Sequence, residues 1–396
     1  MKVSVIVPTL GFHLTVKVLL KALLNQTVSI DEIILVDSSI NNEVQSLCKE
    51  FEDSLPLKYF KVDGLFPGEA RNFGIRQSNG EIIAILDSKT IPQNQWLEKG
   101  IKKLTQSNFD VVFGSTSYLA DTKVQKIFQA CIYGKDPVET TPGSIFPRQI
   151  FKKVGEFIED TRTADDLEWR NRVKYQGLSF YSPSESMQTY DNISKSIFGE
   201  FKRSFIYQLH GAKLDVQKRA RIVILGISII LITLLIPQWN NIVGWESSPL
   251  YIENITKSYF YGLSIFSLII LTISHKFNQL VRNIWFKFLT VSLFLLSSYL
   301  IYKWNSAMAG WVEDSIYFIP HITKIYLGTI IFCGICYRGL YVPLSRGISS
   351  RSIFPINWLF IGFVGFIIDL GKYPGYLIGA ILGLLRLGDK QDKNNP

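Results

Sequence analysis

Short apolar runs alternate with helical patterns over the first 120 residues of the chain. Runs rich in β-branched residues predict strands at residues 3–7, 32–36, 57–61, 81–86 and 110–115. Between them, apolar residues recur every three or four positions, which predicts helices at residues 13–25, 42–51, 69–78 and 94–105. This alternation predicts an α/β fold with a doubly wound, mainly parallel sheet. Sheets of this kind bind ligands at the carboxyl ends of their strands.

Longer apolar runs dominate the chain beyond residue 220. They cover residues 224–236, 259–273, 286–302, 325–337 and 358–368. A helix that crosses a hydrocarbon core of about 30 Å needs roughly 20 largely apolar residues, and the first three runs reach that length with their flanks. We therefore expect a soluble domain at residues 1–193, an amphipathic interfacial linker at 194–221, and an α-helical membrane domain at 222–396 with about four to five transmembrane helices.

The distribution of cations predicts which side of the membrane the soluble half occupies. Basic residues lie at 218–221 and between the second and third apolar runs, whereas the loops at 239–258 and 302–314 each hold one lysine and two acids. Because basic loops stay on the cytoplasmic side, we expect a multi-pass protein of the inner (plasma) membrane with a cytoplasmic N-terminal half. The net charge of +9 is concentrated at these boundaries, which favours lipid headgroups over nucleic acid as the partner.

The last apolar stretch, residues 375–386, contains a glycine repeat. Gly375, Gly379 and Gly383 are spaced four apart, so they lie on one face of a helix. Small residues at this spacing let two helices approach closely, either within the chain or in a homo-oligomer. The stretch is short for a full span, and a re-entrant or interfacial segment is the alternative.

Polar residues follow three of the predicted strands. Thr9 comes after the first strand, Asp37 after the second and Asp87 after the fourth. A single acid at such a position is explained equally well by a turn or a helix N-cap, but two acids and a threonine at one sheet edge favour a ligand site. The first strand is not followed by a glycine-rich dinucleotide motif or a P-loop, which argues against both of those folds.

Residues 67–75, PGEARNFGI, open a predicted helix directly after a turn. The free N–H groups and the dipole at a helix N-terminus favour a bound anion such as a diphosphate. Arg71 lies in the first turns of this helix and offers a charge-assisted contact to phosphate. The alternative is a solvated arginine on an ordinary helix.

Residues 161–177 predict a second polar helix, with Thr163 as its N-cap. Asp165 and Asp166 crowd its first turn, where neighbouring carboxylates suit an acid–base site: one is held in place while the other faces a substrate hydroxyl. The alternative is a structural helix start, in which Asp166 pairs with Arg170 and the next acid, Glu168, pairs with the arginine four positions after it.

Six blocks in this order resemble the inverting family 2 glycosyltransferases with the GT-A fold: VSVIVPTL, EIILVDSS, PGEARNFGI, EIIAILDS, GSIFPRQIFKKVGEF and DDLEWRNR. The resemblance covers roughly residues 1–185. It implies a membrane-bound enzyme that transfers a sugar from a UDP- or GDP-linked nucleoside-diphosphate sugar. The implied acceptor is a lipid-linked saccharide or polyprenyl phosphate in cell-surface polysaccharide or glycolipid synthesis.

The resemblance also implies roles for individual residues. Asp166 matches the catalytic base, and Asp165 stands where the family usually has a glutamate. Six residues are implied to bind the nucleotide sugar in addition to Asp165 and Lys89: Thr9 and Asp37 at the base and ribose, Arg71 and Asp87 near the phosphates, and Gly143 and Ser144 at the sugar.

Asp87 matches the first carboxylate of the family's Asp-x-Asp motif, whose second carboxylate binds Mg²⁺ or Mn²⁺. The chain has Lys89 at that second position. A divalent ion about 4 Å from an ammonium group meets a repulsion of about 8 kcal/mol at an effective dielectric constant of about 20. Three alternatives remain: Lys89 turns away and Asp87 keeps the metal, Lys89 itself meets the diphosphate, or the chain is an inactive, scaffold-like relative in a polysaccharide assembly complex.

Overall fold

The structure is a computed structural model that describes residues 1–11, 13–214 and 331–392, with a few isolated positions between the last two ranges. Residues 1–216 and 336–396 group into one compact unit. The predicted spans at 224–236, 259–273 and 286–302, and the first part of the run at 325–337, lie outside the described residues. The boundaries predicted at residues 193 and 221 stay predictions.

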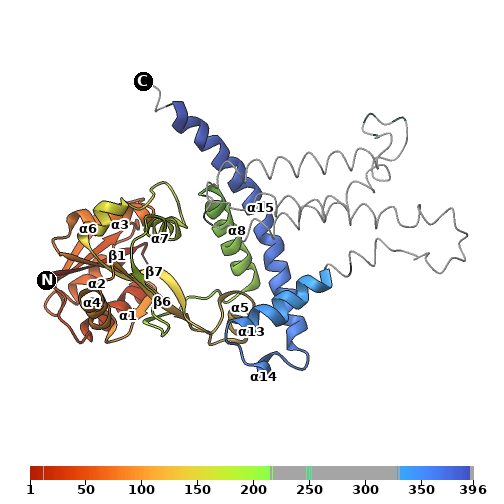
Figure 1. Cartoon of the computed structure of the whole chain (residues 1–396), viewed down its shortest axis with the longest axis horizontal. Coiled ribbons are helices and arrows are strands. Elements are labelled where there is room, and N and C mark those ends of the chain that lie inside the picture. The colour runs from red at the N-terminus through yellow and green to blue at the C-terminus, as the bar shows by residue number, and fades with distance from the viewer. Residues whose placement is uncertain are drawn as a thin grey trace, which may run out of the picture. The chain divides into compact units, whose positions relative to one another are not determined.

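A single mixed sheet organises the N-terminal part of this unit (Figure 1). Its strands are β1 (Val3–Thr9), β2 (Glu32–Asp37), β3 (Leu57–Lys61), β4 (Ile82–Ile85), β5 (Thr90–Pro92), β6 (Val111–Tyr118), β7 (Val138–Pro147), β8 (Phe180–Tyr181) and β9 (Gln188–Tyr190). The order is β3-β2-β1-β4-β7-β6-β9-β5, with β8 beside β6. All five predicted strands are present. Their ends differ from the predicted ends by two residues or fewer, except that β6 runs three residues further.

The sheet departs from a mainly parallel arrangement beyond β4. Strands β3, β2, β1 and β4 are parallel neighbours, as predicted. Strand β7 then pairs antiparallel with both β4 and β6, and β5 pairs antiparallel with β9. Strand β7 was not predicted because its sequence, VETTPGSIFP, holds two prolines and a glycine and only a short apolar run.

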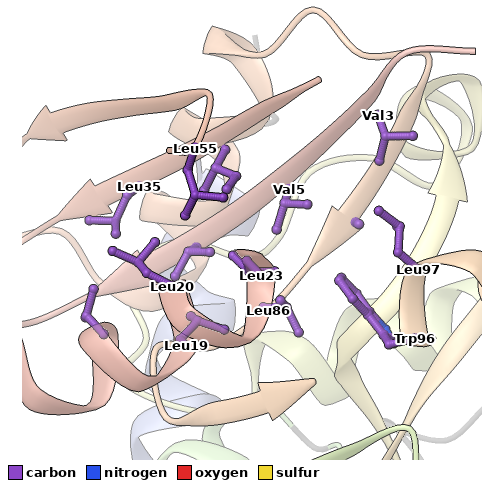
Figure 2. Packing of buried hydrophobic residues seen from close by; sticks show 14 of the residues in the cluster. Val3, Val5, Leu19, Leu20, Leu23, Leu35, Leu55, Leu86, Trp96 and Leu97 are labelled. Atoms are coloured by element: carbon purple, nitrogen blue, oxygen red, sulfur yellow. The ribbon is translucent and has the colours of Figure 1, made fainter. Parts of the chain in front are cut away.

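Helices cover both faces of the sheet, as a doubly wound fold requires. They are α1 (His13–Leu24), α2 (Glu43–Lys49), α3 (Pro67–Gln77), α4 (Trp96–Ser107), α6 (Arg148–Val154) and α7 (Asp165–Tyr175). Three further helices, α5 (Lys123–Phe128), the π-helix η1 (Gln129–Tyr133) and α8 (Ile197–Lys213), pack instead with the C-terminal helix described below. Neighbouring residues of β1 serve opposite cores: Val5 packs with α1, α2 and α4, and Ile6 packs with α3, α6 and α7. Figure 2 shows part of the first core, with Leu20 and Leu35 near each other and Trp96 beside Leu97 on the other side of the view.

Helix α7 begins one residue later than predicted. Its N-cap is Ala164, which has a left-handed backbone with φ of 73°, and the helix starts at Asp165. Thr163 therefore lies outside the N-cap position, and its buried hydroxyl has no hydrogen-bond partner among the residues described. The N-cap prediction for Thr163 was wrong because it placed the start of the helix too early.

The C-terminal segment consists of η2 (Tyr337–Tyr341), α13 (Val342–Ser345), α14 (Ser350–Ile353) and the long helix α15 (Asn357–Asp392). Helix α15 continues through Pro374, so the apolar stretches at 358–368 and 375–386 are one element and not two. Val364 and Ile368 of α15 are buried with Phe128 of α5 and Ile193. The segment thus packs directly on the N-terminal part of the unit.

Helices α8 and α15 lie side by side (Figure 1). A Cβ atom at Gly375 would lie 2.4 Å from the carbonyl oxygen of Phe205, and one at Gly379 would lie 2.1 Å from that of Leu209. Gly371 extends this row by one helical turn and meets the Phe201 ring. The predicted close approach is therefore made within the chain, through Gly375 and Gly379.

Among the described residues, one helix is long and apolar enough to cross a membrane. The stretch Asn357–Gly379 has 23 residues and a mean hydropathy of 1.2, and 44% of its most apolar window is buried against the rest of the protein. Buried core helices pass the same test. The expected series of four to five transmembrane helices therefore stays a prediction.

Candidate functional site

A cavity of about 270 Å³ lies at the carboxyl ends of β1, β2 and β4. Thr9 and Ser38 line it from the first two strands, and Asp87 and Lys89 line it from the segment after β4. Helices α3 and α7 add Arg71, Asp165 and Asp166, although these residues are distant in sequence. The structure thus brings six of the predicted site residues into one cavity: Thr9, Arg71, Asp87, Lys89, Asp165 and Asp166.

Hydrogen-bonding groups in the cavity lining are left without partners. Seven buried side-chain polar atoms lack a hydrogen-bond partner in the part of the chain that the structure describes. Four of them belong to cavity residues, namely Thr9, Ser38, Arg71 and Thr163. Because a buried polar group without a partner costs about 1–3 kcal/mol, this concentration favours a polar ligand at the site.

Arg71 joins two carboxylates below the cavity. Its Nη2 atom donates to Asp87 Oδ1 at 2.7 Å, and its Nη1 atom donates to Asp165 Oδ2. Burial opposes the charge of the guanidinium, but the carboxylates of Asp165 and Asp87 outweigh it and raise the pKa of Arg71. Arg71 is therefore a buried, permanently charged bridge between α3, α7 and the end of β4, and not the solvated arginine of the alternative.

The two adjacent aspartates of α7 have different surroundings. Asp165 is 2% exposed, and burial raises the pKa of its carboxyl to about 7 against the opposing effect of Arg71. Asp166 is only partly buried and faces the cavity. Asp165 thus holds Arg71 and leaves Asp166 as the carboxylate that is accessible to a ligand.

The ion pairs that would make α7 a purely structural helix form only in part. Glu168 accepts from Arg172 at 2.8 Å, as the spacing predicts. Arg170 instead pairs with Glu139 of β7 at 3.2 Å, so it does not neutralise Asp166. The long-range contact with β7 takes the arginine away from the acid that the four-residue spacing assigned to it.

Lys89 lines the same cavity as Asp87. Burial lowers the pKa of the Lys89 ammonium to about 8; repulsion from Arg203 and Arg162 adds to this shift, while Asp87 opposes it. Asp87 is bonded to Arg71, and the described residues contain no group of three His, Cys, Asp or Glu side chains placed to hold a metal ion. Asp87 is thus paired with Arg71 and followed by Lys89, where a metal site would need further acids.

Three predicted binding residues lie outside the cavity lining. Asp37 is fully buried and accepts hydrogen bonds from Tyr59 at 2.9 Å and from the backbone of Ser39 at 3.0 Å. Gly143 and Ser144 lie within β7, where the Gly143 carbonyl accepts from Trp96 at 2.8 Å. Ser144 is also fully buried. For Asp37 the neighbouring Ser38 supplies the cavity contact instead.

Several residues that line the cavity were not predicted from the sequence. Arg162 precedes α7, Tyr190 ends β9, and Tyr207 comes from α8. Arg203, also on α8, donates to the Tyr133 hydroxyl at 3.2 Å and to the Asn192 carbonyl at 2.8 Å. The mixture of basic and aromatic residues in α8 was the available signal for a ligand contact, but the same mixture is typical of a helix at a membrane interface.

Comparisons with known proteins agree on the class of the N-terminal part. The model of the family described as "Glycosyl transferase family 2" matches residues 4–128. Glycosyltransferase AglE of Haloferax volcanii is 26% identical over 192 residues, which is 45% of this chain and 62% of that protein. Chondroitin synthase of Pasteurella multocida is 25% identical over 119 residues, which is 29% of this chain and 12% of that protein. The chain thus spans less than two thirds of these relatives.

Solved structures with weak overall similarity include two complexes with nucleotide sugars. The mannosyltransferase PcManGT from Pyrobaculum calidifontis, in complex with GDP-Man and Mn²⁺, aligns over 94% of this chain and 87% of its own, with a TM-score of 0.46 and 15% identity. S. aureus TarS 1–349, in complex with UDP-GlcNAc, aligns over 96% of this chain and 92% of its own, with a TM-score of 0.41 and 14% identity.

The family match begins in β1 and ends in α5, and it includes Thr9, Arg71, Asp87 and Lys89 of the cavity. The mixed sheet with helices on both faces is a GT-A-like α/β arrangement. Residues 4–128 are therefore similar to the glycosyltransferases of family 2.

Proposed function

We propose that the protein transfers a sugar, with inversion, from a UDP- or GDP-linked nucleoside-diphosphate sugar to a hydroxyl or phosphate oxygen of an acceptor. One observation carries the proposal: Asp166 lines a cavity whose walls hold four buried polar atoms that have no partner among the described residues. The cavity lies at the strand ends where α/β sheets bind ligands, and residues similar to family 2 form part of its lining.

In this proposal Asp166, which lines the cavity, is the general base. It takes the proton from an acceptor hydroxyl as the oxygen forms a bond to the anomeric carbon. The bond from that carbon to the diphosphate oxygen breaks on the opposite side, and its electron pair leaves with the nucleoside diphosphate. Asp165 supports this role because its ion pair with Arg71 fixes the first turn of α7.

The proposed donor contacts follow the cavity lining. Thr9 and Ser38 lie at the ends of the first two strands and offer hydroxyl groups to the nucleoside. Asp37 is buried next to Ser38 and does not line the cavity. Gly143 and Ser144 also lie outside the lining, so their predicted roles at the sugar require a contact beyond this cavity. The buried Nε atom of Arg71 offers a further donor at the level of the phosphates.

We propose a lipid-linked saccharide or polyprenyl phosphate as the acceptor, and the inner membrane as the location. Two features support this: the long apolar runs of the sequence, and the large apolar side chains that α15 exposes, including Phe360 at 56% and Phe363 at 53%. Helix α8 carries Tyr207 into the cavity and packs on α15, which connects the site to this apolar surface.

The Asp166→Asn variant tests the proposed function. The purified full chain is incubated with UDP- and GDP-sugars and lipid-linked acceptors, while nucleotide binding is measured in parallel. We expect transfer to fall by roughly 10²–10⁴-fold and nucleoside-diphosphate affinity to change by less than about twofold, because the base acts only on the acceptor. Glu168→Gln, two positions further along α7, is the matched control and should retain transfer. Undiminished transfer by Asp166→Asn would contradict the assignment.

The same assay separates an enzyme from an inactive scaffold. A scaffold that has kept the fold binds nucleotide and yields no product from any donor and lipid acceptor in the panel. Product formation by the unmodified chain excludes that alternative.

A further inference from the structure

We propose that the diphosphate of the donor is held by the cations Lys89 and Arg162, supported by Arg203, in place of a divalent metal ion. This inference rests on the proposed donor class and concerns how its leaving group is stabilised. Departure of a nucleoside diphosphate builds negative charge on its leaving oxygen, which must be met by groups already arranged around it.

The donor set around Asp87 does not fit a divalent cation. Its Oδ1 atom is already occupied by Arg71 at 2.7 Å, and the position two residues later is a lysine. Mg²⁺ and Mn²⁺ require several oxygen ligands, usually including carboxylates. The cavity's other acids do not replace the missing one, because Asp165 is buried against Arg71 and Asp166 is needed as the base.

The cavity lining contains cations besides Arg71. Three acids, Asp87, Asp165 and Asp166, line it together with three cations, Arg71, Lys89 and Arg162. Arg71 is committed to two of the acids at once. Lys89 and Arg162 are therefore the cations that line the cavity beyond this buried triad, and together they carry the same charge as one divalent ion.

Arg203 of α8 does not line the cavity, but its positive charge is close enough to lower the pKa of Lys89. Its guanidinium is held by the Tyr133 hydroxyl and the Asn192 carbonyl, and it pairs more loosely with Glu200 at 3.7 Å. An anion between Lys89 and Arg162 would relieve the mutual repulsion of these cations. The structural consequence is that α8, which lies beyond the family match, completes the phosphate site.

The test measures binding and not turnover. The purified full chain is titrated with UDP and with GDP, once in EDTA and once in MnCl₂, for the unmodified protein and for Lys89→Ala, Arg162→Ala and Lys89→Asp. Lys102→Ala, an exposed lysine of α4, is the charge-matched control. We expect the unmodified chain to bind at least one of these nucleotides within about twofold in the two buffers. Lys89→Ala and Arg162→Ala should each weaken binding in EDTA by roughly 10- to 100-fold, the range for a charge-assisted hydrogen bond.

The Lys89→Asp variant rebuilds Asp-x-Asp and should lose binding in EDTA by at least as much as Lys89→Ala. Binding by the unmodified chain only in MnCl₂, or unchanged binding by Lys89→Ala in EDTA, would overturn the cation-cluster proposal and leave the proposed function standing. Failure to bind either nucleotide in both buffers would overturn the donor class itself, and the cation-cluster proposal with it.

Discussion

Arg71 of α3 is ion-paired with Asp165 of α7, 94 residues further along the chain, and both side chains are buried. Charges inside a protein are expensive to desolvate, and a buried pair is maintained only while both partners are present. The pair therefore holds the first turn of α7, and with it Asp166, at a fixed place in the cavity.

Replacement of Arg71 by methionine should destabilise the fold by about 3–5 kcal/mol, because Asp165 loses its buried counter-charge. Denaturant unfolding of the full chain, followed by the fluorescence of the buried Trp96 and Trp169, measures the change. Arg76→Met on the same helix is the control, since its pair with Glu156 is exposed and should contribute no more than about 1 kcal/mol. Equal losses of unfolding free energy in the two variants would show that the buried pair stabilises the fold no more than the exposed pair does.

Glu32 provides a pH-dependent part of the stability, at the edge of the sheet opposite the cavity. Burial alone would raise the pKa of Glu32, but hydrogen bonds from Lys58, Ser4 and the Asn79 backbone outweigh it and lower the pKa to about 2. Because the folded pKa lies below the value of 4.5 for a free glutamate, the stabilisation is complete above about pH 4.5 and disappears as the pH falls toward 2.

Glu32→Gln should therefore lower the free energy of unfolding by up to about 3 kcal/mol at pH 7, with the difference from the unmodified chain narrowing below pH 4.5. Unfolding curves at pH 7, 5 and 3.5 measure this trend. Glu50→Gln, which removes an exposed pair with Lys17, should show a small and constant difference. A Glu32→Gln effect that stays constant between pH 7 and 3.5 would contradict the linkage.

Gly379→Ala should separate α8 from α15. The added Cβ would lie 2.1 Å from the Leu209 carbonyl oxygen, a backbone atom that cannot rotate away. We expect a net destabilisation of about 1–2 kcal/mol, since overpacking costs about 1–3 kcal/mol and alanine recovers up to about 1 kcal/mol of helix propensity. Hydrogen exchange of α8 amides measures the loss of protection. Ile378→Ala, at a side chain that is 45% exposed, is the control and should leave α8 protected.

The parallel part of the sheet could be predicted from the sequence because its strands are buried on both faces and read as continuous apolar runs. VSVIVPT and EIILVD are entirely buried in the structure, as that pattern indicates. Strand β7 escaped prediction because Gly143 adopts a φ of 89° and Pro142 interrupts the apolar pattern. Gly143 tolerates this backbone only because it lacks a Cβ atom.

The candidate site could be predicted where its residues follow a strand, and not where they meet through long-range pairing. Thr9 and Asp87 were predicted from their positions at strand ends, and Lys89 from its place in the motif that resembles Asp-x-Asp. The partner of Arg71 was not found, because the local spacing rule examines residues three or four apart and the actual partners lie on other elements. Arg203 and Tyr207 lie in the predicted interfacial linker. Their contacts with distant elements could not be predicted from local spacing.

Tyr207 has a practical consequence for anyone who isolates the catalytic part of this protein. A fragment that stops at residue 193, or at the last residue matched by the family, lacks α8 and so has a cavity with one wall missing. Helix α8 in turn packs on the glycine row of α15, so a fragment that ends before residue 336 also loses the helix that supports this wall. The catalytic part is therefore expected to need residues 336–396 as well as residues 1–216.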